Sequence, residues 1–378
     1  RIFTDKYYSF LNESLSEVIQ IKAFGLENIV SQRYKEYLKE RLRILLKKEV
    51  LLQKIGFIRG GSGNIINVII LFIAGMSIVA GNMTIGMLVS FCSYMEKFFE
   101  ALSKIMELNL NKQEVVVSYE RMNEILNSEK EENNGIILKE PIQKIQFRQV
   151  IFGYKDNLVL KKIDLSIENP GLYSLVGSNG CGKSTIFKLL ERFYECKVGK
   201  IEINQVPINK YSASDLRNNI VYMPKKPFFL QGTIMDNLKL GQNEISDLEV
   251  IEVCKKVGIH SDIQKLEKGY YELIESGGEN FSSGQKQKLG FVRVLLKKAD
   301  IVLLDEVTSD LDGEAERQIC NQIEEIAKKA IVLNIAHKPE SIRRSKKVFF
   351  IQGGKIVAEG THKALMKNCV DYKKIFAN

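Results

Sequence analysis

The feature that most constrains the fold is the glycine-rich run GSNGCGKST at residues 177–185. It follows the apolar run Leu172–Val176, which predicts a strand, and precedes a helix expected to begin near Thr185. The spacing G-x-x-x-x-G-K-[ST] between a strand and a helix is typical of a phosphate-binding loop. Its glycines let successive backbone N–H groups point inward, and the helix amino terminus adds a partial positive charge. The sequence therefore predicts a site for a nucleoside triphosphate.

The residue types in this loop suit ATP with a metal ion. We expect Lys183 to reach the β- and γ-phosphates and Ser184 to offer its hydroxyl to Mg²⁺. The same amides, together with the Lys183 ammonium, are expected to favour the thiolate of Cys181. The loop residues predicted to contact ATP are Gly177, Ser178, Asn179, Gly180, Cys181, Gly182, Lys183, Ser184 and Thr185.

A pair of carboxylates follows a second apolar run, Ile301–Leu304. Adjacent carboxylates at the end of a buried strand are costly unless a cation or a ligand uses them. Asp305 is therefore expected to hold Mg²⁺, and Glu306 is expected to polarise the water that attacks the γ-phosphate. The alternative is an exposed acidic strand end without a catalytic role.

The rhythm of the second part of the chain predicts an α/β fold. Strand-like runs end at Val176, Met223, Leu304 and Ala336, and each is followed by a loop or a helix pattern. This alternation is typical of a mostly parallel sheet with helices on its faces.

The first part of the chain has a different character. Ile65–Ala80 carries no charge, and with its flanks it approaches the roughly 20 residues that cross a bilayer. A buried core helix is the alternative interpretation. The short turn Gly81–Thr84 has no Lys or Arg, whereas residues 35–48 carry six, so the positive-inside rule places residues 1–54 in the cytoplasm.

Charge and cysteine content indicate which partners and which redox environment to expect. The net charge of +9 fits a solvated basic surface or attraction to anionic partners. The sequence has no basic patch interleaved with aromatic residues, so no nucleic-acid partner is expected. The six cysteines show no metal-ligand spacing, and they fit a reduced chain that faces the cytosol.

The run FSSGQ at 281–285 opens a helical pattern and has two interpretations. The serines could act only as an amino-terminal cap. Alternatively, serine hydroxyls, glycine amides and the helix dipole could form a second anion site for a γ-phosphate. In the second interpretation the contacts come from Ser282, Ser283, Gly284 and Gln285.

These motifs, in this order, resemble the ATP-binding-cassette family, and within it the exporters whose membrane and nucleotide-binding parts share one chain. FSSGQ resembles the family signature, TSDLD at 308–312 the D-loop, and IAHKP at 335–339 the switch-histidine loop. The resemblance implies that His337 contacts the γ-phosphate, that Lys183 and Glu306 are catalytic, and that Tyr154 stacks on adenine. It covers about residues 143–378.

The amino-terminal part resembles the exporters less specifically, through residues 13–28 and 81–91. The resemblance implies a P-loop NTPase cassette of α/β fold at 143–378, preceded by an all-α transmembrane segment at 1–127 and a linker at 128–142. The last two spans of the membrane domain would lie at about 55–80 and 84–108. Because the chain begins with Arg1 and not Met, the earlier spans are expected upstream.

The chain departs from the family where cassette and membrane part communicate. Lys225, in YMPKKPFFLQGTI, stands where the family has a glutamine, and Ser276 stands where exporters have a glutamate. An ammonium has only donors and cannot ligate Mg²⁺, so Lys225 is expected to contact the γ-phosphate instead.

The resemblance implies an ATPase of the cell membrane, with several spans and a cytoplasmic cassette, that exports a substrate as a dimer of half-transporters. Homodimer and heterodimer both remain open, as do lipid, peptide and drug-like substrates. A weakly hydrolysing regulatory or partner subunit is the main alternative, and Lys225 motivates it. A soluble cassette protein that acts on ribosomes or DNA is disfavoured by the uncharged run Ile65–Ala80.

Overall fold

The computed structural model describes residues 2–127, 131, 135–240, 242 and 244–376. Side chains at positions 2–5, 55, 58–60, 62–64, 103, 106–111, 113–114 and 276 lie outside this description. The chain divides into two compact units, Arg1–Ser128 and Glu129–Asn378.

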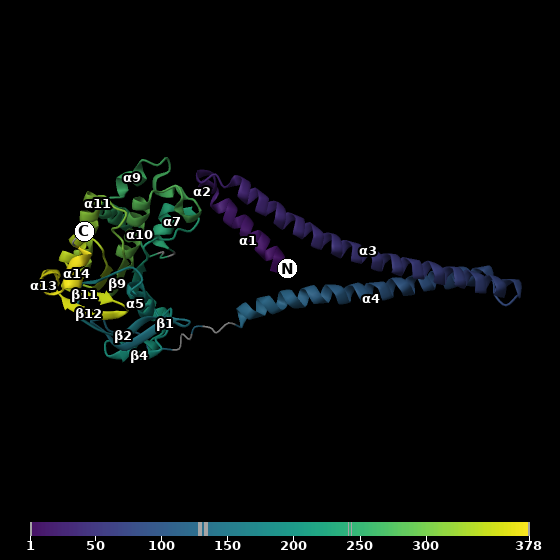
Figure 1. Cartoon of the computed structure of the whole chain (residues 1–378), viewed down its shortest axis with the longest axis horizontal. Helices are drawn as coiled ribbons and strands as arrows, with labels where there is room; N and C mark the ends of the chain where they lie inside the picture. Colours follow the sequence, from purple (N-terminus) through teal and green to yellow (C-terminus); the bar gives the residue numbers. More distant parts are fainter. Residues whose placement is uncertain (1, 128–130, 132–134, 241, 243, 377–378) are drawn as a thin grey trace. The chain divides into compact units, whose positions relative to one another are not determined.

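The amino-terminal unit is helical throughout its described elements. After α3 the chain turns at Gly81, where φ is +75°, and reverses into α4 (Figure 1). Thr84 caps α4, because its side-chain oxygen accepts a hydrogen bond of 3.2 Å from the backbone N–H of Met87. The helices are α1 (Ile2–Ser16), α2 (Val18–Ala23), α3 (Glu27–Val79) and α4 (Ile85–Leu126).

Aromatic side chains join α1 to α3. The hydroxyls of Tyr7 and Tyr34 lie 3.3 Å apart, and the ring centroids of Phe10 and Tyr37 are separated by 5.2 Å. Along the rest of α3 the large apolar side chains are mostly exposed: Phe72 is 69% exposed and Val79 is 90% exposed. Within this chain Phe72 and Val79 are thus not part of a buried core, whereas Ala74 of the same run is 7% exposed.

Among the residues that the structure describes, no helix is both long enough and apolar enough to cross a membrane. The spans predicted at about 55–80 and 84–108 fall within α3 and α4. Several of their side chains lie outside the described residues, and the two spans stay predictions.

The second unit is built around a six-stranded sheet in the order β12-β11-β3-β10-β9-β6. All neighbouring strands in it are parallel except the edge pair β11 and β12. Every residue of β9 and β10 is buried, as is typical of parallel strands covered on both faces. The strands are β3 (Gly171–Gly177), β6 (Ile220–Met223), β9 (Ile301–Asp305), β10 (Ile331–Ile335), β11 (Lys347–Gln352) and β12 (Lys355–Gly360).

An antiparallel sheet in the order β2-β1-β4-β5 faces the first sheet across a hydrophobic core. That core contains Phe147 and Ile163 from the antiparallel sheet, Leu175 and Leu303 from the parallel sheet, and Phe187 from the helix after β3. These strands are β1 (Lys144–Tyr154), β2 (Asn157–Glu168), β4 (Val198–Ile203) and β5 (Val206–Pro207), and a separate pair is β7 (Gly232–Thr233) with β8 (Leu273–Ile274).

The helices of this unit include α10 and α11, which cover a second core together with α8. The α-helices are α5 (Lys183–Leu190), α6 (Ala213–Asn219), α7 (Ile234–Lys239), α8 (Asp247–Val257), α9 (His260–Gln264), α10 (Ser283–Lys297), α11 (Gly313–Ala327), α12 (Pro339–Arg343), α13 (His362–Asn368) and α14 (Val370–Ile375). Short 3₁₀ turns lie at η1 (Ile208–Lys210), η2 (Gly269–Tyr271) and η3 (Ser276–Gly278).

The predicted mostly parallel sheet is confirmed, and its strands end close to the expected residues. β3 and β9 each end one residue later than predicted, at Gly177 and Asp305, β6 ends at Met223, and β10 ends at Ile335. The helix expected near Thr185 begins two residues earlier, at Lys183.

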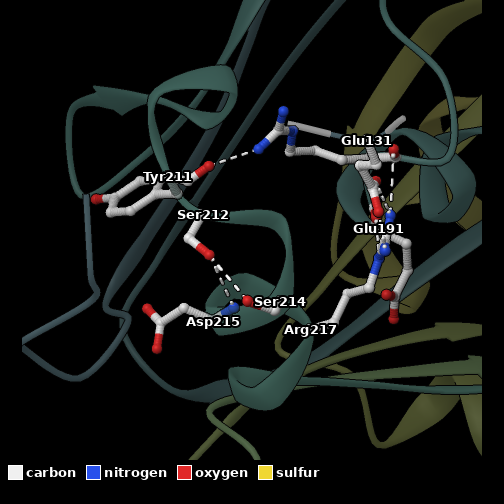
Figure 2. Close-up of polar contacts among 8 residues, drawn as sticks. Glu131, Glu191, Tyr211, Ser212, Ser214, Asp215 and Arg217 are labelled. Atoms are coloured by element: carbon white, nitrogen blue, oxygen red, sulfur yellow. Dashed lines mark hydrogen bonds and ion pairs between the residues drawn. The ribbon is translucent and has the colours of Figure 1, made fainter. Parts of the chain in front are cut away.

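The described part of the predicted linker lies against the cassette. Arg217 of α6 donates hydrogen bonds to both carboxylate oxygens of Glu131 (Figure 2). Further along, Ile136 forms a parallel bridge with Tyr211, and the backbone N–H of Leu138 donates to Asp215 Oδ2 over 2.6 Å. Residues 128–130 and 132–134 of the linker lie outside the described residues.

Candidate active site

Four neighbouring strands of the parallel sheet carry the predicted site residues at their carboxyl ends. The strands β3, β10, β9 and β6 are adjacent in that order. In register, Ile335 of β10 pairs with Leu175 of β3 and with Asp305 of β9, so the three strands end at the same edge. Ligands of open α/β sheets bind outside this edge. The sheet thus brings the loop at 177–185, His337, the carboxylates and Lys225 to one side of the molecule.

The loop at 177–185 wraps around the side chain of Lys183. The ammonium is buried and donates to the backbone carbonyls of Gly177 over 2.7 Å and of Ser178 over 3.0 Å. Gly182 has φ of +102°, and a Cβ there would lie 2.5 Å from Leu160 Cδ2. Only glycine fits this position. Ser178, Asn179 and Gly180 are exposed, so the outer side of the loop is open to a ligand.

The residues of this loop fit a triphosphate. The first N–H groups of a helix have no acceptor within the helix, and those of α5 follow directly on the loop. A Cβ at Gly177 would lie 2.1 Å from the carbonyl oxygen of Ile351, so the backbone can occupy this place only without a side chain. The cradle, the buried ammonium and the helix terminus together supply donors for phosphate oxygens.

Cys181 corrects one expectation. Its side chain is only 6% exposed, and burial raises the pKa of the thiol. The charge of Lys183, whose Nζ lies 4.0 Å from the sulfur, acts in the opposite direction but does not outweigh burial. The expectation of a favoured thiolate is therefore wrong, because the sulfur faces the protein interior.

The predicted metal ligands offer oxygen donors. Asp305 is 7% exposed, and its Oδ2 accepts a hydrogen bond of 3.3 Å from the hydroxyl of Tyr222. Ser184 is half-buried on the first turn of α5. In the part of the chain that the structure describes, no three His, Cys, Asp or Glu side chains cluster closely enough to hold a metal ion. This donor set suits Mg²⁺, which is held in phosphoryl-transfer sites by few protein ligands together with the phosphates.

Glu306 follows Asp305 in a strained conformation. Its φ is +53°, which is uncommon for a residue with a side chain and is found often at functional sites. The backbone is held there from both sides, because its N–H donates to Ile335 and its carbonyl accepts from Ser309, each over 3.1 Å. These two hydrogen bonds hold the backbone of Glu306 in its strained conformation and so determine where its side chain begins.

Two basic side chains contact the Glu306 carboxylate. His337 Nε2 lies 2.9 Å from Oε1, and Lys225 Nζ donates to Oε2 over 2.5 Å. Burial acts to raise the pKa of Glu306, but the hydrogen bond from Lys225 and the charges of His337 and Lys225 outweigh it and hold the pKa below its usual value. The same hydrogen bond raises the pKa of Lys225.

The signature residues form a helix cap. The hydroxyl of Ser282 accepts from the N–H of Gln285 over 3.2 Å, and Gln285 Oε1 accepts from the N–H of Ser282 over 3.0 Å. This reciprocal pair is a capping box. Among the described residues, no hydrogen bond or ion pair links residues 282–285 to the loop at 177–185. The cap interpretation is therefore correct for Ser282 within one chain, and an anion role for this segment stays a prediction.

Tyr154 lies at the end of β1 and packs edge-on against two aromatic rings. Its centroid is 5.0 Å from that of Phe152 and 5.1 Å from that of Tyr194. Lys188 Nζ lies 5.5 Å from the ring centroid, and the Tyr154 hydroxyl is buried without a partner. The predicted stacking of this ring on adenine stays a prediction.

Three residues that sequence reasoning did not single out support the site. Tyr222 contacts Asp305, as described above. Lys338 donates to the carbonyl of Thr308 over 3.0 Å and to Glu316 over 2.9 Å, and so ties the segment after β10 to the D-loop. Gln287 of α10 donates to the carbonyl of Lys225 over 2.5 Å. Tyr222 lies in a predicted strand and Lys338 lies in the run IAHKP, but neither pattern predicted the contact that the side chain makes.

Comparison with known proteins gives the family. The model of the ABC transporter transmembrane region matches residues 2–102, and the ABC transporter model matches residues 160–309. The chain belongs to the ABC transporter family, with a helical membrane region followed by an α/β cassette. The resemblance inferred from the motifs is confirmed.

Individual relatives cover nearly the whole chain. An ATP-dependent lipid A-core flippase of Syntrophus aciditrophicus is 28% identical over 97% of this chain and 62% of its own length. A putative export ATP-binding/permease protein of Rickettsia bellii is 32% identical over 97% of this chain and 65% of its own length. A solved bacterial Atm1-family ABC exporter with ATP bound has a TM-score of 0.89 and 25% identity, over 99% of this chain and 67% of that chain. The chain thus spans less than two thirds of the two sequence relatives.

Proposed function

We propose that this chain belongs to a half-transporter that binds ATP with Mg²⁺ and hydrolyses it to drive export across a membrane. The observation that carries the proposal is the contact between Glu306 and His337, 2.9 Å apart, at the same sheet edge as the phosphate loop. A carboxylate and an imidazole beside a triphosphate cradle suit the attack of water on a γ-phosphate.

The roles of the residues follow from their chemistry. Lys183 would bind the β- and γ-phosphates, and Ser184 and Asp305 would hold Mg²⁺. The ion, when bound, neutralises charge on the phosphate oxygens. Glu306 would accept the proton of the attacking water while the bond from the γ-phosphorus to the bridging oxygen breaks and ADP leaves with the electron pair. His337 would hold the γ-phosphate, and Tyr154 would stack on adenine.

The signature segment would act on a second chain. The family resemblance supports a model in which each ATP lies between the phosphate loop of one cassette and residues 282–285 of another, so that one cassette per chain would require a partner. The absence of a hydrogen bond or ion pair between these two segments, within the described residues, is consistent with this role. Both a homodimer and a heterodimer satisfy it.

The membrane location rests on the relatives and on exposed apolar side chains. Along α3 and α4, Phe72, Val79 and Ile85 are 69%, 90% and 71% exposed. Contiguous exposed apolar surface marks interaction with a membrane or another protein. We expect the protein in the membrane fraction of cells. Recovery in the soluble fraction without detergent would contradict the proposal.

Hydrolysis is tested by the steady-state ATPase rate of the purified full-length protein and its Glu306→Gln variant. We expect the substitution to lower kcat by about 10²–10⁴, the usual contribution of a general base, with ATP binding retained. Glu314→Gln, an exposed acid on α11, is the matched control and should keep the wild-type rate. Equal rates for wild type and Glu306→Gln would refute the catalytic assignment.

A second candidate is a regulatory or partner subunit of a heterodimer that binds ATP and hydrolyses it weakly. The contact of Lys225 with Glu306 favours it, because that carboxylate already has a cation as a partner. A wild-type rate no higher than that of Glu306→Gln, with ATP binding intact, would support this candidate over the first.

A further inference from the structure

Lys225 links the signature helix to the proposed catalytic carboxylate. It follows β6, the edge strand, whereas Glu306 follows the neighbouring strand β9. Met223 pairs in register with Leu304, so each of the two residues lies two positions beyond a paired residue. The ammonium therefore reaches the carboxylate directly, and its Nζ lies 2.5 Å from Oε2.

The backbone of Lys225 is anchored to α10. The buried amide of Gln287, which is 2% exposed, donates to the Lys225 carbonyl over 2.5 Å. Two residues on, Pro227 packs on Gly290, where a Cβ would lie 2.7 Å from the proline Cγ. The backbone of Lys225 is thus held against α10, the helix that begins in the signature run, and this fixes where the lysine side chain begins.

The Glu306 carboxylate has both oxygens engaged. Oε2 accepts from Lys225, and Oε1 is in contact with His337. A general base must present an oxygen within hydrogen-bond reach of the water that it activates. Because His337 is itself expected at the γ-phosphate, the oxygen held by Lys225 is the one that hydrolysis needs.

We propose that Lys225 is a positioning residue that holds Glu306 in an ion pair and must release it before the carboxylate can accept a proton from the attacking water, so that Lys225 slows hydrolysis. The inference rests on the proposed ATPase function and deepens it. In this proposal the Lys225 ammonium binds the Glu306 carboxylate and does not bind the γ-phosphate, which differs from the expectation based on the sequence. Through the hydrogen bond from Gln287 to the Lys225 carbonyl, the pair is tied to α10.

The size of the restraint follows from exposure. The Lys225 side chain is 56% exposed and that of Glu306 is 17% exposed. Ion pairs with one solvated partner contribute modestly to stability. Removal of the ammonium should therefore raise kcat by no more than about fivefold.

The test compares Lys225→Met with Lys225→Arg in the full-length protein. Methionine keeps the apolar part of the side chain and removes the charge, whereas arginine keeps a donor for the carboxylate. We expect a higher kcat for Lys225→Met than for wild type, with KM for ATP within twofold, and a lower kcat for Lys225→Arg than for Lys225→Met. Lys226→Met, at the exposed neighbouring lysine, is the matched control and should leave kcat unchanged. Lys225→Gln provides a second uncharged variant should Lys225→Met fold poorly.

Two further measurements separate this role from others. In the Glu306→Gln background, Lys225→Met should have no effect on the residual rate, because a positioning residue acts only through its partner. The affinities for ATP and ADP, measured with a fluorescent nucleotide in EDTA, should both change less than twofold.

The outcomes that overturn the inference are distinct from a failure of the proposed function. A fall in ATP affinity of tenfold or more with unchanged ADP affinity would assign Lys225 to the γ-phosphate instead. An unchanged or lowered kcat in Lys225→Met, with hydrolysis still dependent on Glu306, would also overturn the restraint. If the Glu306→Gln variant instead hydrolysed ATP as fast as the wild-type protein, the ATPase assignment itself would be refuted.

Discussion

Arg217 donates to both oxygens of Glu131, from Nη1 to Oε2 over 2.7 Å and from Nη2 to Oε1 over 2.5 Å. This pair fastens a linker residue to α6 of the cassette (Figure 2). Both partners are partly solvated, so the pair should contribute at most about 1 kcal/mol. We predict that Glu131→Ala raises the rate of protease cleavage within residues 128–142 by about twofold to fivefold.

Limited proteolysis followed by mass spectrometry measures this cleavage. Glu325→Ala removes an exposed ion pair with Lys328 outside the linker and is the matched control. An unchanged cleavage rate in Glu131→Ala would show that the remaining contacts of the linker hold it without this pair.

Two glycines of the phosphate loop should differ in their tolerance of a side chain. Both have a positive φ, +79° at Gly180 and +102° at Gly182. A Cβ at Gly180 meets nothing within 4 Å, so Gly180→Ala pays only the backbone strain of about 1–2 kcal/mol. A Cβ at Gly182 also collides with Leu160. We predict a clearly larger loss of ATP affinity for Gly182→Ala, measured by displacement of a fluorescent nucleotide. An equal loss of ATP affinity in Gly180→Ala and Gly182→Ala would contradict the prediction.

Glu191 should make stability depend on pH. Burial raises the pKa of its carboxyl to about 7, although the charges of Lys297 and Arg217 act to lower it. An unfolded glutamate titrates near 4.3. Between these values the folded protein binds more protons than the unfolded chain, so the free energy of unfolding falls as pH rises from about 4.5 to about 7.

Glu191→Gln removes that dependence. We predict that the variant gains about 1–3 kcal/mol relative to wild type between pH 5 and pH 8. Melting temperatures of wild type and variant at the two pH values measure the gain. Glu195→Gln, at an exposed glutamate, should show none. A difference between wild type and Glu191→Gln that is the same at both pH values would contradict the raised pKa.

Cys181 should react slowly with a maleimide. Its thiol is buried and its pKa is raised, so both access and the thiolate fraction are low at pH 7. We predict that labelling of Cys181 in the folded protein is at least tenfold slower than in urea, as measured by peptide mass spectrometry. Labelling at the rate of an unfolded thiol would show that the loop opens readily.

The sequence predicted the parts of the site that depend on local order along the chain. The loop at 177–185 and the carboxylates at 305 and 306 lie directly after apolar strands, and a parallel sheet brings the ends of such strands to one edge. To predict that these residues share one edge of the sheet, only the ends of the strands must be known, and the sequence places those ends within one residue. The role of His337 and the membrane region were predicted from the order of the motifs in the family that the chain resembles.

The contacts that sequence reasoning missed depend on which strands are neighbours. Lys225 reaches Glu306 because β6 lies beside β9, an order that no spacing along the chain reveals. Likewise, the direction of the Cys181 side chain depends on how the loop packs on Ile351 and Leu160, and the thiolate expectation was wrong for that reason. Ser282 looked equally suited to a cap and to an anion, and only the geometry with Gln285 shows the cap.

The place of β10 between β3 and β9 has a consequence for biosynthesis. A ribosome completes the phosphate loop and Glu306 before it reaches residues 331–335. Until those residues emerge and insert, the two halves of the site have no strand to set their spacing, and His337 has not been made. A nascent chain can therefore form the antiparallel sheet β2-β1-β4-β5 before the proposed hydrolytic centre is complete.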